Sequence, residues 1–166
     1  MTIINEESGR TDTAKTIGGK HLTFKLDREE YGIEILKIKE IIGIMSITTV
    51  PQTPDYVKGI INLRGKIIPV VDLRMMFGMA TLDYTERTCI VVVEIQRSSG
   101  AVFVGLVVDE VSEVVNLKRE DIEDSPEFSV ALDTDYILGL AKTDGGVKIL
   151  LDIERMLNTE EIGLAA

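Results

Sequence analysis

An internal repeat constrains this chain more than any other feature of its sequence. Residues 56–59 (YVKG) return 80 positions later as residues 136–139 (YILG), and residues 72–73 (DL) return as residues 152–153 (DI). A weaker match, at an offset of 73, aligns residues 31–35 with residues 104–108. Short matches of this kind could also arise between any two apolar hairpins punctuated by glycine. The duplication explains more of the pattern, so we expect the order of strands to repeat along the chain.

The apolar residues are of the kind that favours strands. The chain has 21 Ile and 16 Val among its 166 residues, in short runs broken by Gly, Pro, Asn and Asp. Strands are expected at residues 21–26, 31–35, 41–47, 59–63, 66–72, 88–96, 101–108, 112–117, 137–142 and 147–152. Short helices are expected at residues 35–40, 53–58, 73–77 and 153–157.

The predicted fold class is mainly β, with two pseudo-repeated five-stranded SH3-like barrel subdomains and a few short helices. The domain is expected to span residues 19–157, between a flexible tail at residues 1–18 and a second tail at residues 158–166. The boundary between the two subdomains is expected near residues 80–87. The two barrels are expected to be intertwined, with room for an exchange of terminal strands. A groove for a partner is expected in the seam between the barrels.

Charge and composition exclude several classes of protein. The formal net charge of −10 leaves no basic face for nucleic acid. The longest apolar run, residues 101–108, is far shorter than the roughly 20 residues that cross a bilayer. The first 16 residues have no apolar segment of signal-peptide length. We therefore expect a cytoplasmic protein without direct membrane insertion.

The residues that most often carry chemistry are scarce. His21 is the only histidine, and its place at the start of a strand predicts a solvated side chain. Cys89 lies in an apolar strand without basic neighbours, so it is expected to be a buried small hydrophobe. Neither a P-loop nor a G-x-G-x-x-G fingerprint is present. The sequence predicts no catalytic residues, no cofactor and no metal site, and hence no enzyme.

The sequence of residues 59–74 predicts a hairpin. Asn62 and Gly65 bracket a tight turn in which Gly65 can take the positive φ that such turns need. Arg64 then projects outward at the tip of the hairpin. Pro69 removes a hydrogen-bond donor from the returning strand, which predicts an edge or a bulge at that point.

This hairpin resembles the CheW family of chemotaxis coupling proteins. The resemblance covers residues 20–157 and depends on the run from Gly59 to Arg74, with the motif NLRG at residues 62–65. Two further motifs support it, EEYG at residues 29–32 leading to KEII at residues 39–42, and DEV at residues 109–111. It implies a non-enzymatic scaffold that couples chemoreceptors to the histidine kinase CheA at membrane-bound receptor arrays.

The resemblance also implies partners and site residues. The partners are the cytoplasmic tip of a chemoreceptor, a methyl-accepting chemotaxis protein, and the regulatory domain of CheA. Receptor-side positions of the family carry over to Glu40, Gly59 and Arg64, and we expect Glu40 and Arg64 to pair at the rim of the seam. The kinase-facing surface is expected around four apolar strand residues, namely Ile41, Ile42, Val91 and Val92.

Two other functions are alternatives to the scaffold hypothesis. A small-molecule-binding β-barrel protein would use the groove between the barrels as its pocket, and a ligand retained through purification would favour it. A hydrolase that uses acidic residues lacks the expected site chemistry.

Overall fold

Eleven strands and four short helical turns make up the computed structural model, which describes residues 18–123 and 136–157. The tail expected at residues 1–18 lies outside this description except for Gly18, and the tail expected at residues 158–166 lies outside it entirely. The strands before the first α-helix, α2 (Leu73–Met76), are β1 (Gly19–Leu26), β2 (Glu29–Glu34), β3 (Ile38–Gly43), β4 (Val57–Leu63) and β5 (Lys66–Asp72). Those after α2 are β6 (Cys89–Arg97), β7 (Gly100–Val108), β8 (Glu110–Leu117), β9 (Ile122–Glu123), β10 (Ile137–Thr143) and β11 (Gly146–Leu151). The helical turns are η1 (Ile35–Lys37), α2 (Leu73–Met76), η2 (Arg119–Asp121) and α3 (Ile153–Leu157).

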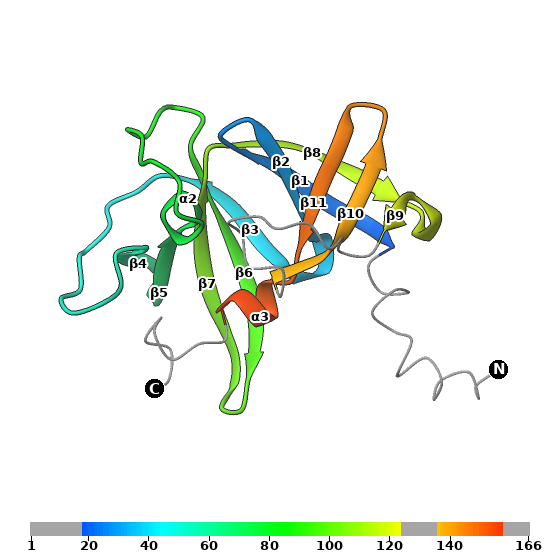
Figure 1. Ribbon diagram of the computed structural model, residues 1–166. Coiled ribbons are helices and arrows are strands. Elements are labelled where there is room, and N and C mark those ends of the chain that lie inside the picture. The colour runs from blue at the N-terminus through cyan, green and yellow to red at the C-terminus, as the bar shows by residue number, and fades with distance from the viewer. Residues whose placement is uncertain (1–17, 124–135, 158–166) are drawn as a thin grey trace.

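The strands form two sheets that lie side by side (Figure 1). One has six strands in the order β8-β1-β2-β11-β10-β9, and the other has five in the order β3-β6-β7-β5-β4. The mainly β class expected from the sequence is confirmed. The six-stranded sheet exceeds the expected five strands only by β9, a two-residue strand at its edge.

The two sheets exchange hairpins between the repeated halves of the chain. The β1–β2 hairpin, from the first half, pairs with β8 and β11 of the second half. The β6–β7 hairpin, from the second half, pairs with β3 and β5 of the first half. Both exchanges create a parallel contact, β11 with β2 and β5 with β7, within otherwise antiparallel sheets.

The repeat is visible at the level of single residues. Strands β4 and β10 have the same sequence of buried and exposed positions, and each shifts register against its partner just before a glycine, Gly59 or Gly139. In each half the carbonyl of a tyrosine accepts the backbone N–H of an aspartate, at 2.7 Å from Asp72 to Tyr56 and 2.8 Å from Asp152 to Tyr136. Equivalent sequence therefore produces equivalent local geometry.

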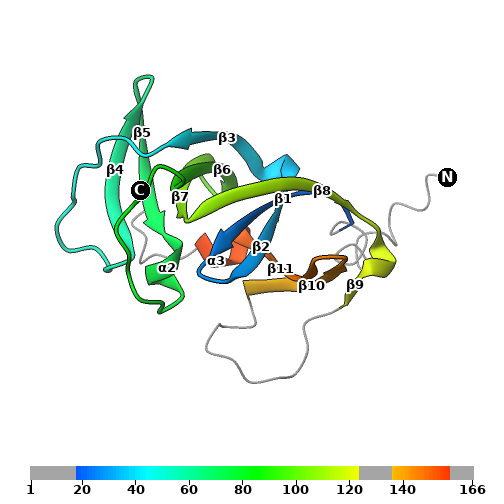
Figure 2. The ribbon, with the colours of Figure 1, turned by 90° about the horizontal axis from the view of Figure 1, so that it is seen from above.

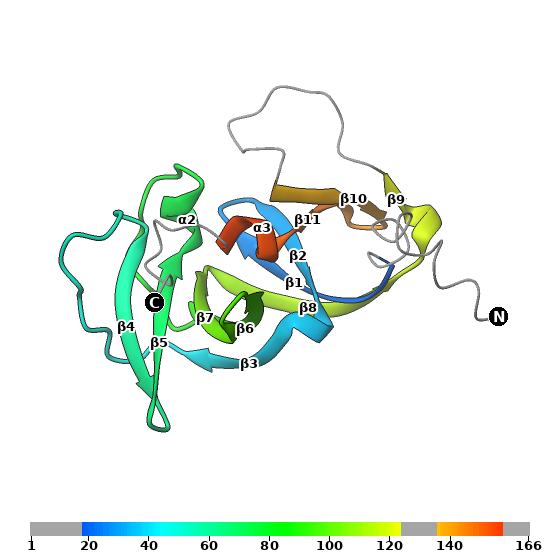
Figure 3. The same ribbon diagram turned by 90° about the horizontal axis from the view of Figure 1, so that it is seen from below.

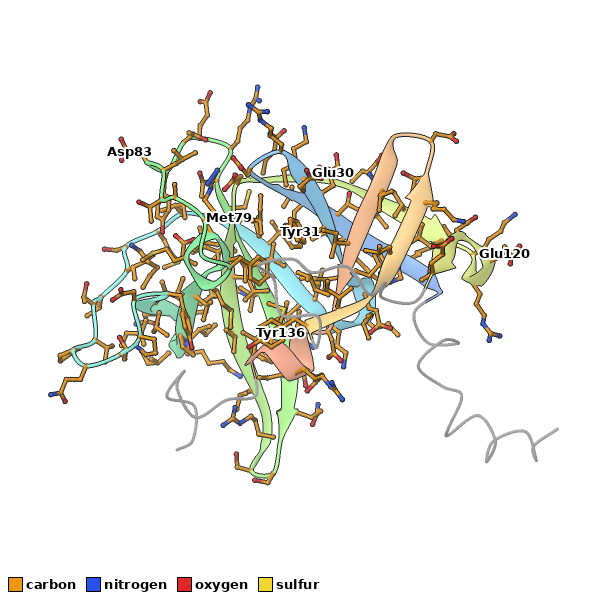
Figure 4. All side chains as sticks on the ribbon, in the orientation of Figure 1. Glu30, Tyr31, Met79, Asp83, Glu120 and Tyr136 are labelled. Carbon is orange, nitrogen blue, oxygen red and sulfur yellow. The ribbon has the colours of Figure 1, made fainter. Side chains whose placement is uncertain are left out.

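The main core fills the space between the two sheets. Tyr31 stacks on Phe24 with ring centroids 6.0 Å apart and lies 5.8 Å from the ring of Phe77. Figure 4 shows Tyr31, Met79 and Tyr136 toward the middle of the molecule, where Met79 and Tyr136 pack against this core. Smaller clusters fill each barrel separately, around Ile61, Ile68, Ile90 and Val92 in one and around Leu117, Ala141 and Leu150 in the other.

Three local expectations are wrong. The helix expected at residues 53–58 is a turn in which the Val57 N–H donates to the Pro54 carbonyl, because the chain must then extend to place Tyr56 beside Asp72. The helix expected at residues 35–40 is only the three-residue turn η1, because β3 already begins at Ile38 to pair with β6. For the same reason the strand expected at residues 41–47 is β3, which ends at Gly43.

His21 is fully buried, which contradicts the expected solvated side chain. Strand β1 lies between β2 and β8, so neither of its edges is open to solvent at this position. The imidazole Nδ1 lies 3.1 Å from the Gly19 carbonyl oxygen, and Nε2 has no hydrogen-bond partner among the described residues. Burial lowers the pKa of His21, and the hydrogen bond to Gly19 only partly offsets this shift.

Candidate functional site

The β4–β5 hairpin projects from the five-stranded sheet (Figure 2 and Figure 3). At its tip Arg64 and Gly65 both have positive φ, 51° and 87°, as in a two-residue turn of type I′. The Asn62 side chain locks the turn by accepting the Gly65 N–H at 2.8 Å. The turn therefore holds Arg64 outward on a backbone that has little freedom.

Arg64 and Glu40 form the ion pair expected from the sequence, and both belong to the five-stranded sheet. Arg64 Nη2 donates to Glu40 Oε1, which links the hairpin tip to β3. The Arg64 side chain is 69% exposed and that of Glu40 is 31% exposed. A pair this exposed contributes about 0–1 kcal/mol to stability, so the fold does not depend on it.

Gly59 lies in strand β4 of this hairpin and serves packing. It is buried, with φ of 144°, and a Cβ there would lie 2.0 Å from the carbonyl oxygen of Thr48. The absence of a side chain lets Thr48 and Ile60 exchange two backbone hydrogen bonds, each of 2.9 Å. Gly59 thus fixes the position of the hairpin against the segment that carries Thr48.

The four apolar positions expected to face a kinase divide into two groups. Ile41 is 42% exposed and Ile42 is half-buried on the edge strand β3. Val91 and Val92, on the neighbouring strand β6, are 0% and 1% exposed and pack into the core. Their side chains have no surface to offer a partner, which corrects this part of the expectation.

A groove of about 770 Å³ opens at the strand ends of the five-stranded sheet. Strands β5 and β7 pair only from Val70 onward, because Pro69 has no N–H to give to the ladder. Before that point the two strands separate, and the groove lies in the gap. Its walls are mostly apolar and include Ile67, which is 60% exposed, and Phe103.

The seam between the two sheets holds a separate hollow of about 600 Å³. Its lining comes from the six-stranded sheet, from η1, from β6 and from α3, and consists of Glu34, Leu36, Lys37, Glu94, Gln96 and Glu154. Leu36 is 93% exposed, and Lys37 Nζ lies 2.9 Å from Glu154 Oε2. A groove was expected in this seam, and this hollow lies there. The larger groove belongs to one barrel alone, because that is where β5 and β7 separate. Glu94 lines both hollows.

The two halves of the molecule are joined by a polar network around Arg74. Its side chain is 8% exposed and donates from Nε to Asp109 at 2.9 Å, from Nη1 to the Ala80 carbonyl at 2.8 Å, and from Nη2 to Asp27 at 3.2 Å. Asp27 lies at the β1–β2 turn and Asp109 lies between β7 and β8, so one guanidinium links the two sheets. Nearby, burial and the charge of Asp72, to which the hydroxyl donates, raise the pKa of Tyr84 well above its usual value.

Sequence reasoning missed Leu36, Lys66, Glu94 and Phe103 as parts of these hollows. No motif marks them, although the apolar and charged alternation of β3 and the proline of β5 were visible signals. Within residues 18–123 and 136–157 there is no group of three acidic, histidine or cysteine side chains that could hold a metal ion. Cys89 is half-buried and packs against the main core.

Comparison with known proteins identifies the family. A family model described as a CheW-like domain matches residues 20–161. This chain belongs to the CheW-like family. It is 44% identical over 150 residues to the chemotaxis protein CheW of Klebsiella aerogenes, covering 90% of this chain and 88% of that protein. The chemotaxis protein CheW of Thermotoga maritima is 33% identical over 144 residues, covering 85% of this chain and 87% of that protein.

A solved structure agrees with the CheW-like assignment. The crystal structure of the scaffolding protein TtCheW from Thermoanaerobacter tengcongensis superposes with a TM-score of 0.78 at 36% sequence identity, covering 87% of this chain and 95% of that chain. The CheW-like chain described here is therefore a chemotaxis scaffold protein. None of the helices in its described ranges has the length and apolar character needed to span a bilayer.

Proposed function

We propose that this protein is a non-enzymatic coupling protein that holds the regulatory domain of the histidine kinase CheA against the cytoplasmic tip of a chemoreceptor. It acts in the cytoplasm and is recruited to membrane-bound receptor arrays. Membership of the CheW-like family supports this role. The observation that carries it is the Glu40–Arg64 pair, a charged feature displayed on a rigid turn although the fold gains little from it.

The receptor-facing surface runs from the seam hollow to the hairpin tip. Leu36 on η1 supplies an exposed apolar anchor, and β3 begins two residues later and leads directly to Glu40. Arg64 completes this surface from the hairpin. An apolar anchor beside oriented charges suits an amphipathic helix docked in a shallow groove. Gly59 supports this surface by positioning the hairpin.

The kinase-facing surface is the apolar end of the five-stranded barrel. Ile41 and Ile42 contribute from β3, and the groove beside Ile67 adds most of the apolar area. Because Glu94 lines both this groove and the seam hollow, the receptor and the kinase would occupy adjacent sites. Signalling would then depend on how the scaffold sets their mutual geometry.

Calorimetric titration tests the proposal. The protein is titrated with a receptor-tip fragment and, separately, with the CheA regulatory domain of the same organism, and we expect saturable binding to both. Arg64→Glu should weaken receptor binding about tenfold or more and leave the melting temperature unchanged. Arg87→Glu is the matched control, since Arg87 is a 72% exposed arginine in a pair with Glu110, away from this surface.

Other results would overturn the coupling role. If the folded protein does not bind the kinase domain, the proposal is wrong. A stoichiometric small molecule that survives purification and is seen by native mass spectrometry in the groove would instead favour the ligand-binding alternative. A loss of folding in Arg64→Glu would make Arg64 a structural residue.

A further inference from the structure

The groove between β5 and β7 carries one uncompensated charge. Three charged residues line it, Lys39, Glu94 and Lys66. Lys39 Nζ lies 3.2 Å from Glu94 Oε1, so these two neutralise each other. Lys66 has no ion pair within the described part of the chain. The adjacent Arg64 is already paired with Glu40. The groove therefore has a net positive charge at Lys66, in a protein whose net charge is −10.

The Lys66 ammonium is held in place over an aromatic wall. Its Nζ lies 4.6 Å from the centroid of the Phe103 ring, and Lys39 Nζ lies 5.8 Å from the same ring. Cation–π attraction to the ring restricts the otherwise flexible lysine side chain. Binding a partner through this ammonium therefore costs less side-chain conformational entropy than binding through an unrestricted lysine would.

We infer that Lys66 is the charge-selecting residue of this groove, and that the groove accepts an apolar side chain of its partner together with one neighbouring carboxylate. The apolar side chain would pack against Ile67 and Phe103, and the carboxylate would pair with Lys66 Nζ. A single carboxylate fits better than a phosphate dianion, because only one cation here is unpaired. The inference rests on the proposed function, since it takes the CheA regulatory domain as the partner.

The pair between Lys66 and the partner's carboxylate is selective because it lies beside an apolar wall. A charge pair that is partly shielded from water is stronger than one in open solvent, and a like charge at the same place is repelled. A partner with Lys or Arg at that point would be rejected. Lys66 thus distinguishes among partners that present similar apolar side chains.

Two substitutions at Lys66 and one control test the inference. Titrations against the CheA regulatory domain are run at low and high salt with wild type, Lys66→Glu, Lys66→Met and Lys20→Glu. Lys20 is an exposed lysine on β1 of the other sheet, and it provides the same charge change far from the groove. We expect Lys66→Glu to weaken binding about tenfold to a hundredfold and Lys66→Met to weaken it several-fold. Lys66→Met should also reduce the salt dependence of binding, and Lys20→Glu should behave as wild type.

The outcomes separate the inference from the proposed function. If wild type fails to bind the kinase domain, the coupling role itself is wrong. If wild type binds and Lys66→Glu binds equally well, or if Lys20→Glu weakens binding as much, the charge selection by Lys66 is refuted while the coupling role stands. Melting curves of each variant show that the comparison is made between folded proteins.

Discussion

Replacing Gly59 by alanine should destabilise the folded protein at the hairpin rather than merely remove a contact with a partner. The new Cβ would lie 2.0 Å from the Thr48 carbonyl oxygen and 2.7 Å from its carbon, both of them backbone atoms. The segment carrying Thr48 must therefore move away, which removes the two hydrogen bonds between Thr48 and Ile60. Alanine must in addition adopt a φ of 144°, which is strained for any residue with a side chain.

The magnitude follows from these two effects. Each backbone hydrogen bond contributes about 0.5–1.5 kcal/mol net, and the unfavourable φ costs about 1–3 kcal/mol. We expect Gly59→Ala to lower the free energy of unfolding by about 3 kcal/mol, measured by urea denaturation followed by circular dichroism. Receptor binding should weaken only as far as the hairpin is displaced.

Substitutions at two other glycines separate the cost of a steric clash from the cost of a positive φ. Gly43 has no heavy atom within 4 Å of an added Cβ and no positive φ, so Gly43→Ala should change stability by less than about 0.5 kcal/mol. Gly65 has a φ of 87° but no contact within 4 Å, so Gly65→Ala should cost about 1 kcal/mol from strain alone. If Gly59→Ala is no more destabilising than Gly65→Ala, the argument from the Thr48 contact is wrong.

Two further predictions concern Arg74, which links the two sheets, and the buried His21. Arg74→Ala should destabilise the protein by about 3 kcal/mol in urea denaturation, because it leaves Asp109 without its nearly buried partner. Asp27→Asn, at a 62% exposed position, should cost at most about 1 kcal/mol. Equal effects of the two substitutions would contradict the central role given to Arg74. Because the pKa of His21 is lowered in the folded protein, the unfolded chain binds the proton more tightly. The contribution of neutral His21 to the free energy of unfolding is therefore complete above pH 6.5 and is lost as the pH falls below that value. His21→Gln should remove this part of the pH dependence measured by denaturation between about pH 7.5 and pH 5.5, and an unchanged profile would show that His21 stays exposed to solvent.

The sequence predicted those elements whose signals are local. Strand β5 was expected at residues 66–72 and has these bounds, because a continuous apolar run between a glycine turn and an aspartate defines it without reference to the rest of the chain. The short helices α2 and α3 follow an aspartate, and Asp72 caps α2 by accepting the N–H groups of Arg74 and Met75. Local chemistry was sufficient in these cases.

Features set by distant parts of the chain could not be derived in this way. His21 was expected in solvent because the sequence does not show that β1 is flanked by both β2 and β8. Val91 and Val92 were expected at a surface because their burial depends on which sheet covers which face. The groove arises where Pro69 ends the contact between β5 and β7, and the proline was visible while its neighbouring strand was not. The ionic links of Arg74 join segments 35 and 47 positions away, so no spacing rule could find them.

The exchange of hairpins between the two sheets makes the halves of this chain mutually dependent. A cut in the connection between α2 and β6 would leave an N-terminal piece with β1–β5 and a C-terminal piece with β6–β11. Neither piece would contain a complete sheet, since the β1–β2 hairpin would lack β8 and β11, and the β6–β7 hairpin would lack β3 and β5. Separately produced pieces should therefore be unfolded or aggregated, and should regain structure only when mixed, as a pair of complementing fragments.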